Sequence, residues 1–351
     1  MSASATPALQ LAIRQLASGA SLTEAESQDA FTTVMSGEAT SAQVAALLVG
    51  LRVKGETSAE VAGAAAALRG AMVRLPSPEP AHLVDTCGTG GGAVSTFNIS
   101  TAAALLAAGL GVRIAKHGNR SFTSQCGSAD VLEALGVPIE VGVDLMERAL
   151  REAGIVFMFA PLMHPAMRHV GPVRRELGIQ TVMNIVGPLA NPAGAGRQVV
   201  GVADARRVPL IAGALRTLGT IHALVVHGEP GMDEISPLGT TRVVEIREGT
   251  TREWTVDPAA HGFGTGVAAE LVGGSPEHNA TIIEQVLGGS APPTAMAAVV
   301  LNAAAALFVS PRAPDAFGDA IAAARDGLRA GVGLEALGRL RGAYNQPLTG
   351  H

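Results

Sequence analysis

Short apolar runs alternate with helical segments from residue 82 to residue 228, and this alternation limits the fold more than any other feature of the chain. Strands and helices that alternate at this spacing form a largely parallel sheet with helices on its faces. We therefore predict an α/β domain over residues 80–351, with a mainly parallel central sheet. The expected strands are residues 82–87, 112–118, 137–141, 155–161, 197–204 and 221–228, and the expected helices between them are residues 101–111, 128–136, 144–154 and 207–219.

Before this alternation, the sequence reads as helices only. Apolar residues recur at helical spacing in residues 9–72, with stops at Gly19 and Gly37. Serines at helix starts, Ser21, Ser41 and Ser58, are expected N-caps, and Ser21 has Glu24 three residues later as in a capping box. Residues 1–74 are therefore predicted to form a small helical domain. The proline-rich, helical segment near residues 164–190 interrupts the strand rhythm and is expected to join it.

Composition excludes several classes of protein. The 351 residues carry a formal net charge of −5 and only 3% aromatic residues, which disfavours a nucleic-acid partner. The two cysteines, Cys87 and Cys126, are too few for a disulfide framework and are expected to be reduced thiols. The sequence shows no signal-peptide pattern and no uninterrupted apolar run of about 18 residues. We expect a cytoplasmic protein without membrane contact.

A glycine-rich loop follows the first expected strand, in VDTCGTGGGAVSTFNIST. Glycines let backbone N–H groups approach an anion, and the helix that starts near Ser100 and Thr101 adds partial positive charge. The sequence therefore favours a phosphate or diphosphate ligand over a simple flexible turn. It is not a Walker A loop, since no Lys-Ser or Lys-Thr follows, and Lys116 stands where a Rossmann fold needs an acid.

A second polar stretch, KHGNRSFTSQCGSAD, begins at Lys116 at the end of the next expected strand. The carboxyl ends of parallel strands share one edge of the sheet, so this stretch is expected beside the glycine loop. Lys116 supplies a charge for phosphate, and the following polar side chains supply hydrogen-bond donors. Two alternatives are a solvated surface loop and an Arg120 that simply pairs with Asp130.

Two further stretches carry charge at informative places. Asp233 and Glu234 follow the strand IHALVVHG, and adjacent carboxylates on a tight turn suit a divalent cation shared with substrate phosphates. Alone, the pair would read as an exposed acidic turn. Arg174 and Arg175 lie on an expected helix with little other charge, and one of them could pair with a substrate carboxylate. Spacing does not choose between the two arginines.

Taken together, GTGG with NIST, KHGNRS with GSADVLEALG, RRELGIQTVMNIVGPLANPA with RQVVGV, and HG with MDEIS resemble the anthranilate phosphoribosyltransferase family. The resemblance runs from Val84 to Ser236. It implies a nucleoside phosphorylase/phosphoribosyltransferase-like fold, with the active site in a cleft between a helical and an α/β domain, and a homodimer formed through the helical domains. It also implies a pentosyltransferase of tryptophan biosynthesis. With Mg²⁺, this enzyme would convert phosphoribosyl pyrophosphate and anthranilate into phosphoribosylanthranilate and pyrophosphate.

The resemblance implies three groups of site residues. Ser100, Asp233 and Glu234 would hold magnesium, and Gly88, Asn119 and Arg174 would contact anthranilate. No residue is a certain catalyst, although His117 is a candidate for positioning. Contacts to phosphoribosyl pyrophosphate would come from Gly88, Gly91, Gly92, Thr96, Asn98, Ile99, Ser100, Thr101, Lys116, His117, Gly118, Asn119, Arg120, Ser121, Phe122, Thr123, Ser124 and Ser128.

One departure and two rival functions remain at this point. The family loop usually reads GTGGD, and here Gly92 replaces the aspartate, which is expected to weaken substrate or metal handling. A pyrimidine nucleoside phosphorylase-like enzyme is the nearest rival, but it has no use for magnesium on Asp233 and Glu234. The other rival is a non-enzymatic, nucleic-acid-binding relative, which the net charge of −5 disfavours.

Overall fold

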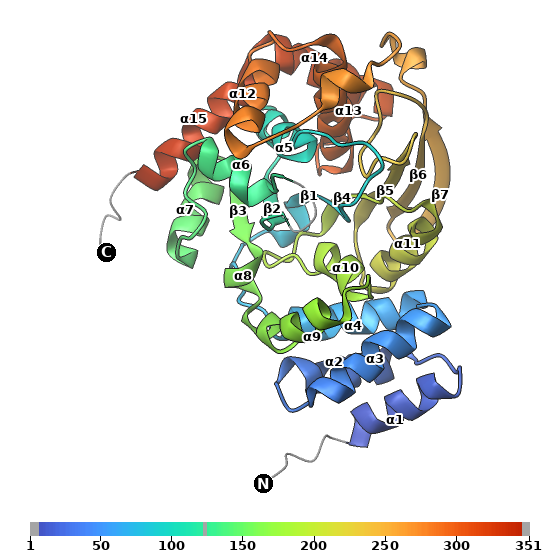
Figure 1. The fold of residues 1–351 in the computed structure, drawn as a ribbon. Coiled ribbons are helices and arrows are strands. Elements are labelled where there is room, and N and C mark those ends of the chain that lie inside the picture. Colours follow the sequence, from blue (N-terminus) through green and yellow to red (C-terminus); the bar gives the residue numbers. More distant parts are fainter. Residues whose placement is uncertain (1–6, 122–124, 346–351) are drawn as a thin grey trace. The chain divides into compact units, whose positions relative to one another are not determined.

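The computed structural model describes residues 7–121 and 125–345, drawn in Figure 1. The chain divides into two compact units. The first comprises Met1–Arg74, Pro161–Pro192 and Pro209–Gly219, and the second comprises Leu75–Ala160, Ala193–Val208 and Thr220–His351. Residues 209–219, which the sequence prediction left in the α/β domain, group with the helices.

The first unit is helical. Phe31, Leu47, Leu48 and Leu51 are fully buried and form much of its core. Helices α2 and α4 pack on each other, as do α1 and α3, while α9 packs on α3. Its helices are α1 (Pro7–Ala17), α2 (Glu24–Met35), α3 (Ser41–Lys54), α4 (Ser58–Gly70), α8 (Ala160–Met163), α9 (Gly171–Leu177), α10 (Met183–Val186) and α11 (Val208–Thr217), with 3₁₀ turns η2 (Pro165–His169) and η3 (Gly187–Leu189).

The predicted N-caps of these helices were wrong by one or two residues. Threonines rather than serines cap α2, α3 and α4, and each forms a complete capping box. Thr40 and Thr57 have Gln43 and Glu60 three residues later, whereas Ser41 and Ser58 have valine at that spacing. The hydroxyl with a glutamate or glutamine at the third position therefore becomes the cap. At α2 this rule does not choose, because Ser21 also has a glutamate three residues later, and the box forms at Thr23 with Glu26.

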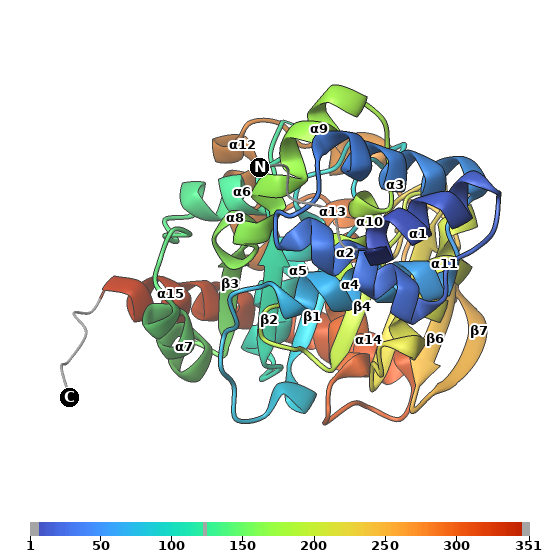
Figure 2. The same cartoon turned by 90° about the horizontal axis from the view of Figure 1, so that it is seen from below.

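The second unit contains a seven-stranded sheet in the order β3-β2-β1-β4-β5-β6-β7, with β3 and β7 at its edges (Figure 2). Strands β1 to β5 are parallel, while β6 and β7 are antiparallel. The predicted α/β class with a mainly parallel sheet is therefore confirmed. The strands are β1 (Val84–Gly88), β2 (Ile114–Gly118), β3 (Ile155–Phe159), β4 (Arg197–Gly201), β5 (His222–Gly228), β6 (Thr241–Arg247) and β7 (Thr250–Val256).

Two details of this sheet differ from the sequence prediction. Residues 137–141 form no strand, because Val137 and Ile139 are buried as part of the connection between two helices rather than in the sheet. The hairpin of β6 and β7 was missed. Most residues of β7 are exposed, and an edge strand with a largely polar sequence lacks the apolar run that identified the others.

Alanine-rich helices cover the sheet. Helix α13 packs against β1, β4 and β5, and α5 packs against β1, β2 and β3 (Figure 1). Small side chains let these helices approach the strands closely. The helices are α5 (Ile99–Gly109), α6 (Ser128–Ala134), α7 (Val143–Glu152), α12 (Pro276–Leu287), α13 (Pro293–Val309), α14 (Phe317–Arg329) and α15 (Val332–Asn345), with 3₁₀ turns η1 (Pro80–His82), η4 (Ala205–Arg207), η5 (Ala259–His261) and η6 (Ala268–Leu271).

Among the residues that the structure describes, no helix combines the length and apolarity needed to cross a membrane. Cys87 and Cys126 are free thiols, as predicted.

Candidate functional site

Three loops meet where parallel strands end in the α/β unit. The register pairs Gly88 with Gly201 and Gly201 with Val226, so β1, β4 and β5 end at one edge of the sheet. The backbone of Asp233 lies so close to this edge that a Cβ on Gly201 would come within 3.0 Å of it. A Cβ on Gly88 would likewise come within 3.0 Å of the Asp233 carboxylate. Bare backbone is therefore required where the loops approach one another.

The glycine loop lies against Asp233. The Gly90 amide donates a hydrogen bond of 2.8 Å to Oδ2 of Asp233. Gly90 and Gly91 have φ angles of +71° and +77°, a region that other residues rarely adopt. A Cβ on Gly92 would be 3.4 Å from Oδ1 of Asp233, so a side chain there would point at the same carboxylate.

Lys116, Ser100 and Glu234 form the centre of the site. Lys116, predicted at a strand end, is instead the middle residue of β2 and is 3% exposed. Its Nζ donates to Oγ of Ser100 at 3.2 Å and to the carbonyl oxygen of Thr86. The amide of Ser100, in the first turn of α5, donates to Oε1 of Glu234 at 3.2 Å. A carboxylate thus occupies the amide-rich start of the helix, where anions are favoured.

Burial shifts the pKa values of these charged groups. Burial and the neighbouring Asp233 raise the pKa of Glu234 to about 8. Burial also raises the pKa of Asp233, although the hydrogen bond from Gly90 opposes the shift. Burial lowers the pKa of Lys116, and Asp85 offsets part of this. The raised pKa values of these two half-buried carboxylates would fall again if a cation bound beside them, because a cation stabilises their ionised form.

These groups fit a divalent cation held partly by substrate. Asp233, Glu234 and Ser100 offer oxygen atoms only, which suits a hard cation. No cluster of three or more His, Cys, Asp or Glu side chains able to hold a metal occurs within residues 7–121 and 125–345. A site with two carboxylates is the arrangement in which magnesium keeps waters and takes further ligands from phosphates.

Several predicted residues lie around the start of α5. Asn98 precedes the helix, and its side chain donates to the carbonyl oxygen of Cys126 at 3.2 Å and accepts from Asn279 at 2.9 Å. Ile99 is buried, and the Thr101 hydroxyl is buried with no hydrogen-bond partner in the described part of the chain. Thr96 lies just before this segment. Asn98 is therefore occupied by protein groups.

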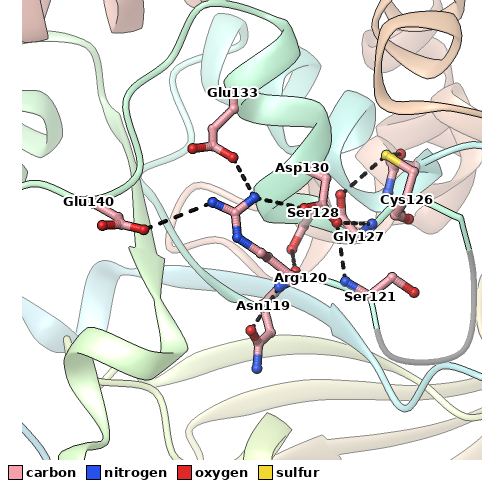
Figure 3. A network of polar contacts seen from close by, with 10 residues as sticks. Asn119, Arg120, Ser121, Cys126, Gly127, Ser128, Asp130, Glu133 and Glu140 are labelled. Carbon is pink, nitrogen blue, oxygen red and sulfur yellow. Dashed lines mark hydrogen bonds and ion pairs between the residues drawn. The ribbon is translucent and has the colours of Figure 1, made fainter.

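The second polar stretch packs on the start of α6, as Figure 3 shows. The carbonyl oxygen of Asn119 accepts from the amide of Ala129 at 3.2 Å and from Oγ of Ser128 at 3.3 Å. Arg120 pairs with Asp130 at 2.9 Å and also contacts Glu133, so the alternative of an Arg120–Asp130 pair is realised. Its predicted contact with a phosphoribosyl donor remains a prediction.

Three predicted donor contacts, Phe122, Thr123 and Ser124, lie outside the described residues. His117 and Gly118 end β2, and the amide of His117 donates to Oδ1 of Asp85 at 3.2 Å. No observation tests the expected positioning role of His117.

Arg174 and Arg175 lie on α9 in the helical unit. Arg174 is partly buried, Arg175 is exposed, and burial lowers the pKa of Arg174. Arg174 has no carboxylate partner among the residues described. Exposure therefore distinguishes the two arginines where their spacing did not, and the ligand contact expected of Arg174 stays a prediction.

Sequence reasoning missed two residues that hold the site in place. Asp85 on β1 is fully buried and binds the amide of His117. Asn302 on α13 accepts from the amide of Ile235 and donates to its carbonyl oxygen, both at 2.9 Å, which fixes the residue after Glu234. The only sequence signal was a single asparagine in the otherwise apolar run VVLNAAAALF.

The sequence of this chain matches a known protein family along most of its length. Residues 80–334 match the model of the a/b domain of a glycosyl transferase family, and residues 10–72 match its helical bundle domain. Over 331 residues, the chain is 48% identical to the anthranilate phosphoribosyltransferase of Rubrobacter xylanophilus, in an alignment that covers 94% of this chain and 96% of the relative.

The fold is also similar to those of solved anthranilate phosphoribosyltransferases. The anthranilate phosphoribosyltransferase of Thermus thermophilus is 40% identical with a TM-score of 0.89, over 95% of this chain and 99% of that chain. The enzyme of Saccharomyces cerevisiae in complex with PRPP and Mg is 26% identical with a TM-score of 0.86, over 98% and 99%.

Proposed function

Because the chain belongs to the anthranilate phosphoribosyltransferase family, we propose that it transfers the phosphoribosyl group of phosphoribosyl pyrophosphate to the amine of anthranilate. The products are N-(5-phosphoribosyl)anthranilate and pyrophosphate, a step of tryptophan biosynthesis. The chain is thus a pentosyltransferase, and the relative from Saccharomyces cerevisiae was solved with PRPP and Mg.

The observation that carries this proposal is the cluster of the buried Lys116 with the half-buried Ser100, Asp233 and Glu234 beside the glycine loop. A diphosphate needs cationic groups and amide donors, and this edge of the sheet supplies both. A nucleoside phosphorylase reaction would have no use for magnesium on these two carboxylates. Their presence favours a magnesium diphosphate donor over the rival enzyme.

Magnesium is the cofactor that these oxygen atoms suit. We propose that Asp233 and Glu234, with the hydroxyl of Ser100, hold it. Bound there, the ion would neutralise charge on the diphosphate. The residues of the chain then determine how the donor is oriented and how its charge is balanced.

The harder chemical task is to loosen the bond between the anomeric carbon and pyrophosphate. Lys116 and the amides of the glycine loop would stabilise the negative charge that develops on the leaving group. The amine of anthranilate is already uncharged near neutral pH, so no general base is required. His117 is proposed to position substrate rather than to accept a proton.

For the acceptor, we propose that Arg174 binds the carboxylate of anthranilate, with Gly88 and Asn119 as further contacts. A guanidinium can form two parallel hydrogen bonds to a carboxylate, which fixes orientation as well as binding. The partial burial of Arg174 supports this role, because burial strengthens a charge pair once a partner arrives.

We further propose a cytoplasmic homodimer formed through the helical unit. Leu11 on α1 and Val53 on α3 are 58% and 82% exposed, and apolar surface on packed helices supports an interface. Light scattering tests it: the native chain should elute at twice its monomer mass and Val53→Asp should shift toward monomer. A monomeric native chain would refute the dimer.

Turnover is tested by incubating the chain with anthranilate, phosphoribosyl pyrophosphate and magnesium. Mass spectrometry should identify phosphoribosylanthranilate, with one pyrophosphate released for each anthranilate consumed. Omission of either substrate is the matched control. Donor binding without turnover would point to a different acceptor, and a folded chain that binds no donor would overturn the proposed function.

A further inference from the structure

The strongest unexplained feature is the set of acidic contacts around Arg120, drawn in Figure 3. The guanidinium contacts Asp130 at 2.9 Å, Glu133 at 2.5 Å and Glu140 at 3.9 Å. Its charge is thus already balanced by protein carboxylates. An arginine reserved for a substrate phosphate would not be surrounded by three acids.

Asp130 makes the more informative contacts of the set. Its Oδ2 accepts from the amide of Ser121 at 3.2 Å and from the amide of Gly127 at 2.8 Å, while Oδ1 binds Arg120. One carboxylate therefore joins a residue before positions 122–124 to one after them. Burial would raise the pKa of Asp130, but the bonds from Gly127 and Arg120 lower it, so the carboxylate is ionised.

The two segments that Asp130 joins lie in direct contact. A Cβ on Gly127 would come within 3.0 Å of the backbone of Asn119, Arg120 and Ser121. The carbonyl oxygen of Asn119 also binds Ser128 and Ala129, the first residues of α6. Two residues proposed to contact the donor, Asn119 and Ser128, are therefore held next to each other by direct contacts between residues 119–121 and 127–129.

The contacts of Asp130 differ in strength. Its ion-pair partner Arg120 has a 42% exposed side chain, and ion pairs with an exposed partner contribute little. Asp130 has an 18% exposed side chain, and its bonds to amides are charge-assisted. The carboxylate–amide bonds therefore dominate, and Arg120 compensates the charge of Asp130.

We propose that Asp130 is a positioning residue for the donor, and that Arg120 acts through Asp130 rather than by touching phosphate. This inference rests on the proposed function and adds a residue to it. Asp130 holds Ser121 and Gly127 together, and this fixes the positions from which Asn119 and Ser128 contact phosphoribosyl pyrophosphate.

The test compares variants of the full chain by steady-state kinetics. Asp130→Ala should raise the KM for phosphoribosyl pyrophosphate about tenfold, since it removes both charge-assisted bonds to backbone amides, and should leave kcat within about twofold. Asp130→Glu should recover much of this loss, because a glutamate at the third position of a helix also reaches back to the cap amide. Glu133→Gln is the matched control. Its KM for phosphoribosyl pyrophosphate should stay within about twofold of the wild-type value, since it removes only an exposed partner of Arg120.

A double-variant cycle separates positioning from direct contact. Arg120→Gln should raise the donor KM less than Asp130→Ala, and the double variant should be no worse than Asp130→Ala. An Arg120→Gln effect that exceeds and adds to that of Asp130→Ala would show that Arg120 binds the donor itself. Unchanged donor KM in Asp130→Ala would overturn the proposal.

Hydrogen exchange keeps this test independent of turnover. In Asp130→Ala, the amides of Ser121 and Gly127 should exchange faster than in wild type while the thermal unfolding profile of the chain is retained. If wild type shows no turnover, the proposed function fails. The exchange rates alone then show whether Asp130 holds the amides of Ser121 and Gly127. Unchanged exchange at both amides would contradict the role of Asp130.

Discussion

Nζ of Lys116 on β2 lies 3.2 Å from Oγ of Ser100 on α5, which places a buried ammonium group at the start of a helix. The same Ser100 donates its amide to Glu234. A single serine therefore lies between the cation and the carboxylate of the site. A charged donor and a helix start together make a site for a diphosphate.

Replacing Lys116 should weaken binding of the donor. Lys116→Met keeps the length of the side chain but removes the charge, and we expect the Kd for phosphoribosyl pyrophosphate to rise about 10- to 100-fold, the loss of one charged hydrogen bond. Calorimetric titration measures it, with the exposed Arg216→Met in the helical unit as control. An unchanged Kd in a folded Lys116→Met chain would remove this lysine from the site.

Replacing Arg174 should affect the acceptor alone. Arg174→Ala removes the proposed carboxylate partner, so the KM for anthranilate should rise about tenfold or more while the donor KM stays within about twofold. The exposed Arg175→Ala is the matched control and should resemble wild type. An equal rise in the KM values of both substrates would contradict the assignment of Arg174 to anthranilate.

The sequence predicted the parallel sheet because its strands are mostly apolar runs separated by helices. It placed Lys116 at a strand end, whereas Lys116 is the middle residue of β2, and Asp233 follows the end of β5 by five residues. It could not predict β7, whose exposed side chains lack that pattern. Long-range partners were also beyond it: Asn302 binds Ile235 from 67 residues away. Of the three carboxylates that contact Arg120, the sequence analysis considered only Asp130, because a sequence does not show which side chains meet in space.

Restoring a carboxylate at position 92 should change the response to magnesium. A Cβ there would be 3.4 Å from Oδ1 of Asp233 and 3.1 Å from the carbonyl oxygen of Gly231. Gly92→Asp should therefore add charge beside Asp233 and lower the magnesium concentration for half-maximal rate. Gly92→Asn has the same shape without the charge and should not. The same magnesium dependence in both variants would exclude an electrostatic effect at position 92.

Glu234 should make the metal-free protein less stable as pH rises. Its folded-state pKa is about 8, above the ordinary value of 4.5, so its proton is held more tightly in the folded chain. Between these values the unfolded chain binds fewer protons, and the free energy of unfolding falls. Urea unfolding in chelator from pH 5 to pH 8 should show this decline, and Glu234→Gln should reduce it. An equally steep decline in Glu234→Gln would assign the pH dependence to other groups.

The central claim is that Asp233 and Glu234 bring magnesium to a diphosphate donor. Its most direct test is the initial rate of anthranilate consumption, followed by fluorescence against magnesium concentration, in wild type and in Asp233→Asn/Glu234→Gln. Wild type should be inactive in chelator and saturate with magnesium, while the double variant should lose both the rate and the saturation. Turnover that persists in chelator, or a double variant with the wild-type response, would contradict the account.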